Sequence, residues 1–178
     1  IPIDSITTYY NSLDPIAPII SSVSLANDNT TIAITMSEPV YNSNGASGGL
    51  EASDFAFSIS GGAATLSSIT PSSISAISNV YTLGISLSGT ANGSESLTVN
   101  PVNDGIWDAA ANEASTSQSN NTASLNDKLS PTMTITATDG SNAVSDGATT
   151  NDATLTVTLT SSEATSNFVV GDITVSGG

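Results

Sequence analysis

The sequence predicts an all-β protein built from antiparallel β-sandwiches, the second of them incomplete. Apolar and polar residues alternate with a period of two through most of the chain, which is typical of strands with one buried face. Clusters of Gly, Asn, Asp and Ser interrupt this alternation about every ten residues. No segment carries an apolar stripe at helical spacing for more than a turn. Short strands with frequent turns favour a sandwich.

Each expected strand is an alternating run rich in Ile, Val, Thr and Leu. The first complete example is TTIAITMSE, which follows the apolar segment DPIAPIISSVSL. β-branched residues pack well on a half-buried pleated surface, so these runs favour strands over helices. In chain order, the expected strands are residues 30–38, 54–60, 80–89, 96–102, 132–138, 153–161 and 172–177.

Composition and charge exclude several functional classes. The 178 residues contain 16 acids and one base, Lys128, which gives a formal net charge of −15. Such a chain repels the phosphates of nucleic acids and anionic membrane surfaces, and it attracts cations. Cys and His are absent, which removes disulfides, the usual zinc ligands, thiol nucleophiles and His-based triads. We therefore expect no enzymatic activity. We also expect no membrane insertion, because no run of about 18 apolar residues is present.

Several short motifs occur twice in the same order. An Asp-x-x-x-Pro segment begins at Asp14 and again at Asp127, and Ser-Glu pairs follow at 37–38 and 162–163. Each pair precedes an Asp that opens an alternating run ending in Gly-Gly. Internal repetition of this kind predicts a tandem array. We therefore expect residues 1–13 to be the end of a preceding repeat and a linker, 14–127 a complete repeat, and 128–178 the first half of a following repeat.

These motifs resemble the bacterial Ig-like repeats of large surface adhesins of the gliding-motility and biofilm type. The resemblance covers residues 14–178. It is carried by Asp14 and Pro18, Ser37-Glu38-Pro39-Val40, Asp54-Phe55, Gly61-Gly62, and Asp108 with Asn112. It implies tandem Ig-like sandwiches with Greek-key topology, on the cell surface. The family usually has Gly before the last Asn, where this chain has Ala111.

Acidic residues occur at the chain positions that a Greek-key sandwich brings to one pole. Asp14 precedes the first strand, Glu38 follows the second, and Asp104 and Asp108 lie in the last long loop. Oxygen ligands without nitrogen or sulfur suit Ca²⁺, so we expect a structural calcium ion at junctions between repeats. By repetition, Asp127 and Glu163 take the places of Asp14 and Glu38 at the next junction. The alternative is that all of these acids are solvated turn residues.

Three functions are compatible with a chain of this kind. The resemblance implies a structural stalk repeat of a secreted, surface-anchored adhesin, which spaces a distal binding module from the cell. Its partners would be neighbouring repeats of the same long chain, while another part of that chain binds a surface glycan or protein. The alternative is a glycan- or protein-binding Ig-like module. A two-carboxylate glycosidase is disfavoured, because four Tyr and one Trp offer little surface to hold a sugar ring.

The tryptophan can be interpreted in two ways. Trp107 lies beside Ile106 in the last long loop. It caps one pole of the core, or it forms an exposed platform for a ligand.

Overall fold

The computed structural model describes residues 14–176 and contains almost only β-structure. The expectation for residues 1–13 lies outside the described residues. The chain forms two compact units, Ile1–Leu129 and Ser130–Gly178. Two single-turn 3-10 helices accompany the strands, Ala52–Asp54 and Val170–Asp172. Over the described range, no helix is long and apolar enough to cross a membrane.

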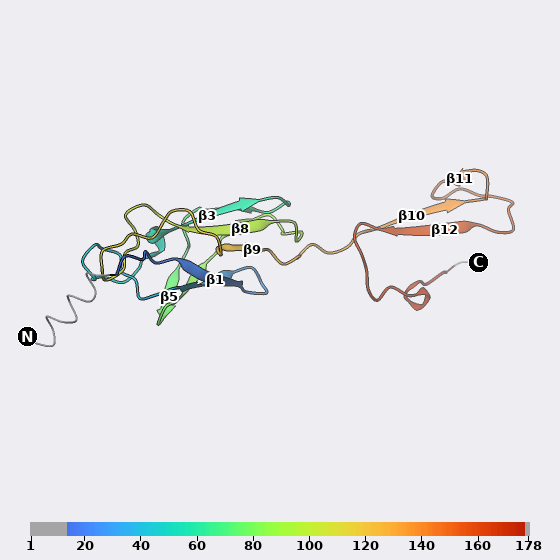
Figure 1. The fold of residues 1–178 in the computed structure, drawn as a ribbon. Helices are drawn as coiled ribbons and strands as arrows, with labels where there is room; N and C mark the ends of the chain where they lie inside the picture. Colours follow the sequence, from blue (N-terminus) through green and yellow to red (C-terminus); the bar gives the residue numbers. More distant parts are fainter. Residues whose placement is uncertain (1–13, 177–178) are drawn as a thin grey trace, which may run out of the picture. The chain divides into compact units, whose positions relative to one another are not determined.

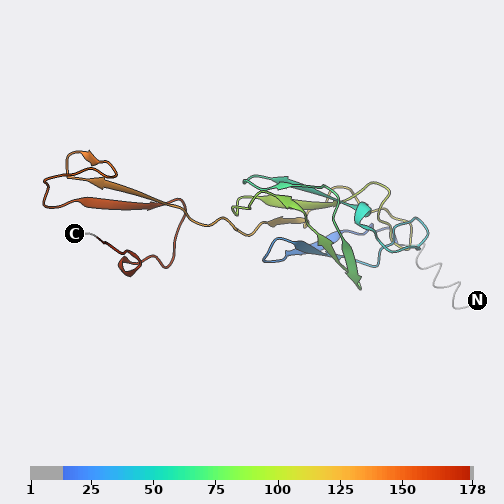
Figure 2. The ribbon, with the colours of Figure 1, turned by 180° about the vertical axis from the view of Figure 1, so that it is seen from behind.

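Two main antiparallel sheets form the first unit (Figures 1 and 2). The four-stranded sheet has the order β1 (Ile20–Leu25), β2 (Thr31–Met36), β6 (Val80–Gly84) and β5 (Ile74–Ile77). The three-stranded sheet has the order β3 (Phe55–Ser60), β8 (Ser96–Pro101) and β9 (Thr122–Ser124). A small third sheet pairs β4 (Thr65–Leu66) with β7 (Leu87–Ser88).

The core of this unit is built by the alternating strands that the sequence predicts. Every second residue of β2 and of β8 is buried. Ile32 and Ile34 on β2 are fully buried, as are Leu97 and Val99 on β8. Burying a side chain of this size stabilises a fold by about 1.5–3 kcal/mol, so these two strands contribute strongly to the stability of the unit.

One predicted strand is divided in two. Residues 80–89 form β6 and β7, which pair with strands of different sheets. The change of sheet follows Gly84, where a Cβ would clash with the side chains of Ser72 and Ser73. Glycine therefore permits a close approach of the chain at the point where it leaves the first sheet.

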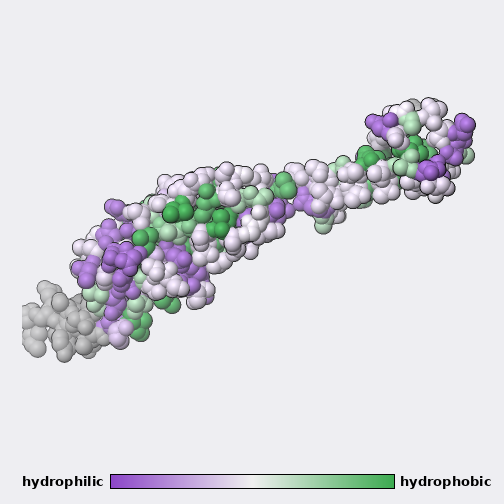
Figure 3. All heavy atoms as spheres, turned by 90° about the horizontal axis from the view of Figure 1, so that it is seen from above, coloured by the Kyte–Doolittle hydropathy of each residue, from purple (hydrophilic) through white to green (hydrophobic). Residues whose placement is uncertain are grey.

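The second unit contains one three-stranded sheet and no buried residue within the described range. Its order is β11 (Ala143–Val144), β10 (Met133–Thr138) and β12 (Thr156–Ser161), all antiparallel. Apolar side chains remain at its surface, as the green spheres of Figure 3 show. Ile135 is 65% exposed and Val157 is 54% exposed.

The strand predicted at residues 172–177 is not present in the part of this segment that the structure describes. Residues 170–172 form a 3-10 turn, and 173–176 have no regular structure. In the first unit the equivalent strand, β3, is hydrogen-bonded along its whole length to β8. Among the described residues after Leu129, no strand takes the place of β8. The expected strand therefore has no partner for its backbone groups.

The repeated motifs form the same local hydrogen bonds at both of their occurrences. Asp14 Oδ1 accepts the N–H of Ile16, and Asp127 Oδ1 accepts the N–H of Leu129, both at 2.9 Å. The Ser of each Ser-Glu pair binds the start of the first strand in the same way. The N–H groups of Ile19 and Thr132 donate to the hydroxyls of Ser37 and Ser162, at 3.0 and 2.9 Å.

The third motif also recurs as a structure. The carboxylates of Asp54 and Asp172 each accept the backbone N–H three residues earlier, from Glu51 and Val169. In both places the Asp N–H returns a bond to the carbonyl of that earlier residue. The repetition seen in the sequence is thus a repetition of local structure.

Candidate metal centre

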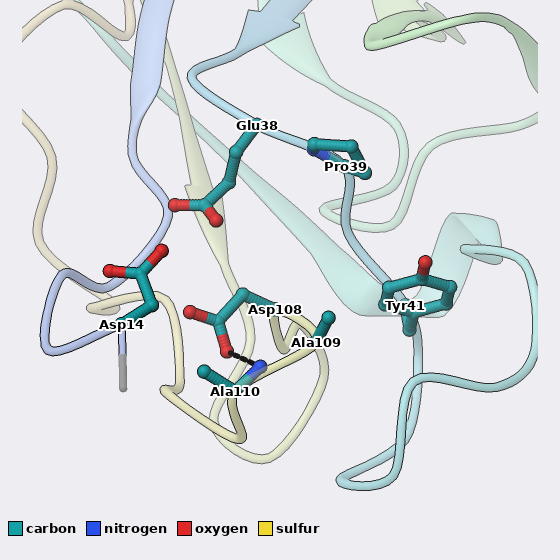
Figure 4. Close-up of a pocket in the computed structure, with 7 residues that line it drawn as sticks. All are labelled: Asp14, Glu38, Pro39, Tyr41, Asp108, Ala109 and Ala110. Carbon is teal, nitrogen blue, oxygen red and sulfur yellow. Dashed lines mark hydrogen bonds between the residues drawn. The ribbon is translucent and has the colours of Figure 1, made fainter. Parts of the chain in front are cut away.

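Three carboxylates from distant parts of the sequence meet at one end of the first unit (Figure 4). Asp14 precedes β1, Glu38 lies two residues after the end of β2, and Asp108 lies in the loop between β8 and β9. One oxygen of each lies within 4.8 Å of the others. They line an open hollow of about 310 Å³, together with Pro39, Tyr41, Ala109 and Ala110.

Asp108 is the structural centre of this group. It is 1% exposed, and its Oδ1 accepts the N–H groups of Ala110 and Asn112 at 2.8 and 2.7 Å. Its Oδ2 accepts the Asn112 side-chain N–H at 2.7 Å. That side chain also donates to the carbonyl of Asp14 at 2.8 Å. Asp108 and Asn112 therefore hold the loop closed and fasten the start of the unit to it.

The loop contains a residue in an unfavourable backbone conformation. Ala111 has φ of 71°, in the left-handed region that costs a residue with a Cβ about 1–2 kcal/mol. The resemblance implies Gly at this position, and the geometry explains that preference.

We expect Ala111→Gly to stabilise the first unit by about 1 kcal/mol, because glycine adopts this conformation without the Cβ clash. The greater freedom of glycine in the unfolded chain reduces the gain but does not reverse it. Urea unfolding of the two proteins measures the difference. Ala110→Gly, at a neighbouring position without a positive φ, is the matched control and should be neutral or destabilising. Equal or lower stability of the Ala111→Gly protein would contradict the prediction.

The electrostatics of the group are those of unneutralised carboxylates. Partial burial raises the pKa of Glu38 above its usual value, and the nearby charges of Asp108 and Asp14 raise it further. Lys128 is the single base of the chain, and its backbone N–H binds the carbonyl of Ala91, in the loop before β8. No lysine or arginine is therefore available to neutralise the three acids.

The remaining predicted ligands lie elsewhere. The expectation that Asp104 joins the other three is wrong for this structure: the group within 4.8 Å does not include it. Its backbone N–H donates to Glu113, and its carboxylate accepts from the Asn103 side chain. The Asp104 side chain therefore stabilises the local turn. Asp127 belongs to the first unit and Glu163 to the second, and their role at a junction stays a prediction.

Trp107 is half-buried and lies at the same end of the first unit as the three carboxylates. Its backbone exchanges two hydrogen bonds of 2.8 Å with Tyr41. Its indole N–H points to the carbonyl of Asp104, at 3.4 Å. This agrees better with a residue that caps the core than with a free platform.

Sequence reasoning missed Glu95, an acid as deeply buried as Asp108. It is 1% exposed, and its carboxylate accepts the N–H groups of Ala63, Ala64 and Asn92 at 2.8–3.2 Å. Burial alone would raise the pKa of Glu95, but these N–H groups outweigh it and lower the pKa to about 2. Gly62 makes room for this carboxylate, because a Cβ there would overlap it. The Gly-Gly at residues 61–62 is therefore explained by this carboxylate, but the motif alone does not indicate which acid it accommodates.

No family model matches the chain, and no curated protein matches it significantly. Among solved structures, it is similar to the N-terminal part of the bacterial S-layer protein SbsC, with 19% identity and a TM-score of 0.45. The similarity covers 90% of this chain and 44% of that structure, so the chain spans less than half its length.

Proposed function

We propose that this protein is a non-catalytic structural segment of a bacterial cell-surface protein. In this proposal tandem Ig-like β-sandwich repeats form an extracellular stalk that carries a binding module away from the cell. The observation that carries the proposal is the recurrence of three hydrogen-bonded motifs at equivalent places in successive repeats. Each repeat of such an array contacts only its neighbours, so adding repeats lengthens the array.

The chemistry of the described surface supports a structural role. The clustered side chains at the hollow are carboxylates and one tyrosine, and no nucleophile is paired with a base. The high acidic charge keeps an exposed protein soluble and prevents adhesion to anionic surfaces.

An antibody raised against the chain tests the location and the role. On intact cells of the source organism it should label the surface, and mild external protease should remove the label. Labelling that requires permeabilised cells would contradict the proposal. Hydrolysis of a polysaccharide by the purified protein would contradict its non-catalytic part.

Calcium is the ion that fits the three carboxylates of the candidate centre. Ca²⁺ takes six to eight oxygen ligands, and Asp14, Glu38 and Asp108 supply only oxygen. Asp14 is exposed and Glu38 half-buried, so water can complete the coordination. An ion at this position would join the segment before β1, the end of β2 and the loop before β9. The proposed ion is therefore structural.

We expect calcium to raise the melting temperature of the chain and a chelator to reverse the effect. An ion that binds only the folded state adds about 2.7 kcal/mol at a hundredfold excess over Kd. Without metal, like charges about 4 Å apart cost roughly 1 kcal/mol per pair in water, and more where they are partly buried. Glu38→Gln should therefore be more stable than the natural protein in chelator and should respond less to calcium. Thermal melts of both proteins, with chelator and with millimolar calcium, measure these two differences in melting temperature.

Asp104→Asn is the matched control, because it also removes one negative charge but lies outside the group. It should keep the full calcium response. If none of the three proteins responds to calcium, the three acids hold no ion, and Asp108 serves only to close its loop.

A further inference from the structure

The first and last segments of the first unit lie side by side without backbone hydrogen bonds between them. β1 contacts β9, although the two strands belong to different sheets. Over the described residues, no hydrogen bond between backbone groups joins residues 14–29 to residues 112–128. The two segments must therefore be held together by side chains.

Carboxamide side chains make these connections at three levels. Asn112 donates to the carbonyl of Asp14 at 2.8 Å. Gln118 Oε1 accepts the N–H of Ile20 at 2.9 Å. At the third level, the backbone of Asn126 exchanges two hydrogen bonds with the side chain of Asn29.

The third connection is a reciprocal pair. Asn29 Nδ2 donates to the carbonyl of Asn126 at 2.8 Å, and Asn29 Oδ1 accepts the N–H of Asn126 at 2.9 Å. The Asn126 side chain adds bonds to Asn29 Oδ1 and to the carbonyl of Ala26, at 3.0 and 3.1 Å. Asn29 is 3% exposed and has φ of 62°, a conformation that Asn tolerates better than most residues. The Asn29 side chain is thus shielded from water, which otherwise competes for hydrogen bonds, while Asn126 is half-buried.

The order of the three connections shows that the two segments run parallel. Positions 112, 118 and 126 bind at 14, 20 and 26–29, so both numbers rise together. The chain enters this unit at one end and leaves it at the other (Figure 1). Tension on the two ends of the unit pulls parallel segments in opposite directions. All three connections then bear the load together, rather than opening one after another.

We propose that Asn112, Gln118 and the Asn29–Asn126 pair form a mechanical clasp, which resists unfolding when the chain is pulled from its ends. The inference deepens the proposed stalk role, because a surface stalk bears tension. The mechanical test and the surface-labelling test can fail separately, because the response of the chain to force does not depend on where the protein is located.

The test is single-molecule pulling of the full chain by its termini. Forced unfolding reports the unfolding rate. A tenfold change in this rate corresponds to about 1.4 kcal/mol in the unfolding barrier, close to the net contribution of one hydrogen bond to stability. Asn126→Ala should raise the unfolding rate at constant force by about tenfold or more. Gln118→Ala loses one bond between the segments, whereas Asn126→Ala loses two, so Gln118→Ala should raise the rate less. It provides a second readout if Asn126→Ala folds poorly.

Two controls separate the clasp from general stability. Val99→Ala removes buried contacts in β8 without touching the clasp, so it should lower the urea midpoint but change the rate under force less than Asn126→Ala does. The chain has no cysteine, so Ser75→Cys on the exposed strand β5 offers a unique second attachment point. Pulling between the N-terminus and this residue no longer pulls the two segments apart along their length, so Asn126→Ala should raise the unfolding rate less than it does when the chain is pulled by its termini. Equal rates for Asn126→Ala and the natural protein, or an effect of the same size in both geometries, would overturn the proposal.

Discussion

Replacing Glu95 by alanine should destabilise the first unit by about 3 kcal/mol or more, among the largest single-residue effects in the chain. The change leaves three backbone N–H groups without their acceptor, those of Ala63, Ala64 and Asn92. Each buried donor left unsatisfied costs about 1–3 kcal/mol. Solvent that enters the vacated space reduces this cost. Urea unfolding followed by tryptophan fluorescence measures it, because Trp107 reports on this unit alone.

Glu95→Gln isolates the charge from the shape of the side chain. Its carbonyl oxygen keeps the acceptor position, so we expect a loss of only about 1–2 kcal/mol at pH 7, since bonds to a charged acceptor are stronger than neutral ones. The pKa of Glu95 falls from 4.5 to about 2 on folding. Its stabilisation is therefore complete above pH 4.5 and is lost as the pH falls toward 2.

The difference between the natural protein and Glu95→Gln should consequently shrink over that pH window. Val99→Ala, which changes no titratable group, serves as the control, and its difference from the natural protein should stay constant over the same window. A difference that stays constant down to pH 2 would show that the buried carboxylate is not held as its hydrogen bonds indicate.

Local sequence patterns predicted the strands that have a buried face and a partner. The alternation in TIAITM and SLTVNP corresponds to β2 and β8, where apolar residues point into the core. Alternation alone could not locate β5, because three of its four residues are exposed and packing does not constrain them. It also placed a strand at residues 172–177, since the pattern carries no information about whether a partner strand exists.

The candidate site was predictable as far as topology determines it. Asp14 and Glu38 flank strands whose pairing brings them together, and Asp108 closes the loop that packs beside them. Asp104 is only four residues from Asp108, yet its turn directs its hydrogen bonds to Asn103 and Glu113. Glu95 and the Asn29–Asn126 pair depend on contacts between distant loops. No local pattern in a single sequence specifies those contacts.

Separating the two units should leave cooperative folding in the first fragment and none in the second. Residues 14–129 should fold alone with a cooperative transition, because this fragment contains the whole described core. Residues 130–178 should show none. A three-stranded sheet with no buried residue in its described part buries too little surface to offset the loss of chain entropy, about 1–2 kcal/mol per residue for the backbone. Circular dichroism during urea titration distinguishes the two fragments.

Matched substitutions in the full chain test the same point without cutting it. Ile32 and Val157 each follow the first residue of an equivalent strand, β2 and β12, and are 0% and 54% exposed. Ile32→Ala should cost about 2–5 kcal/mol, as deletion of buried methyl groups does. Val157→Ala should change stability by less than about 0.5 kcal/mol, because its side chain gains little burial on folding. A cooperative transition in the isolated 130–178 fragment, or a large cost for Val157→Ala, would mean that this sheet buries a core of its own. The stability of the chain would then not reside in the first unit alone.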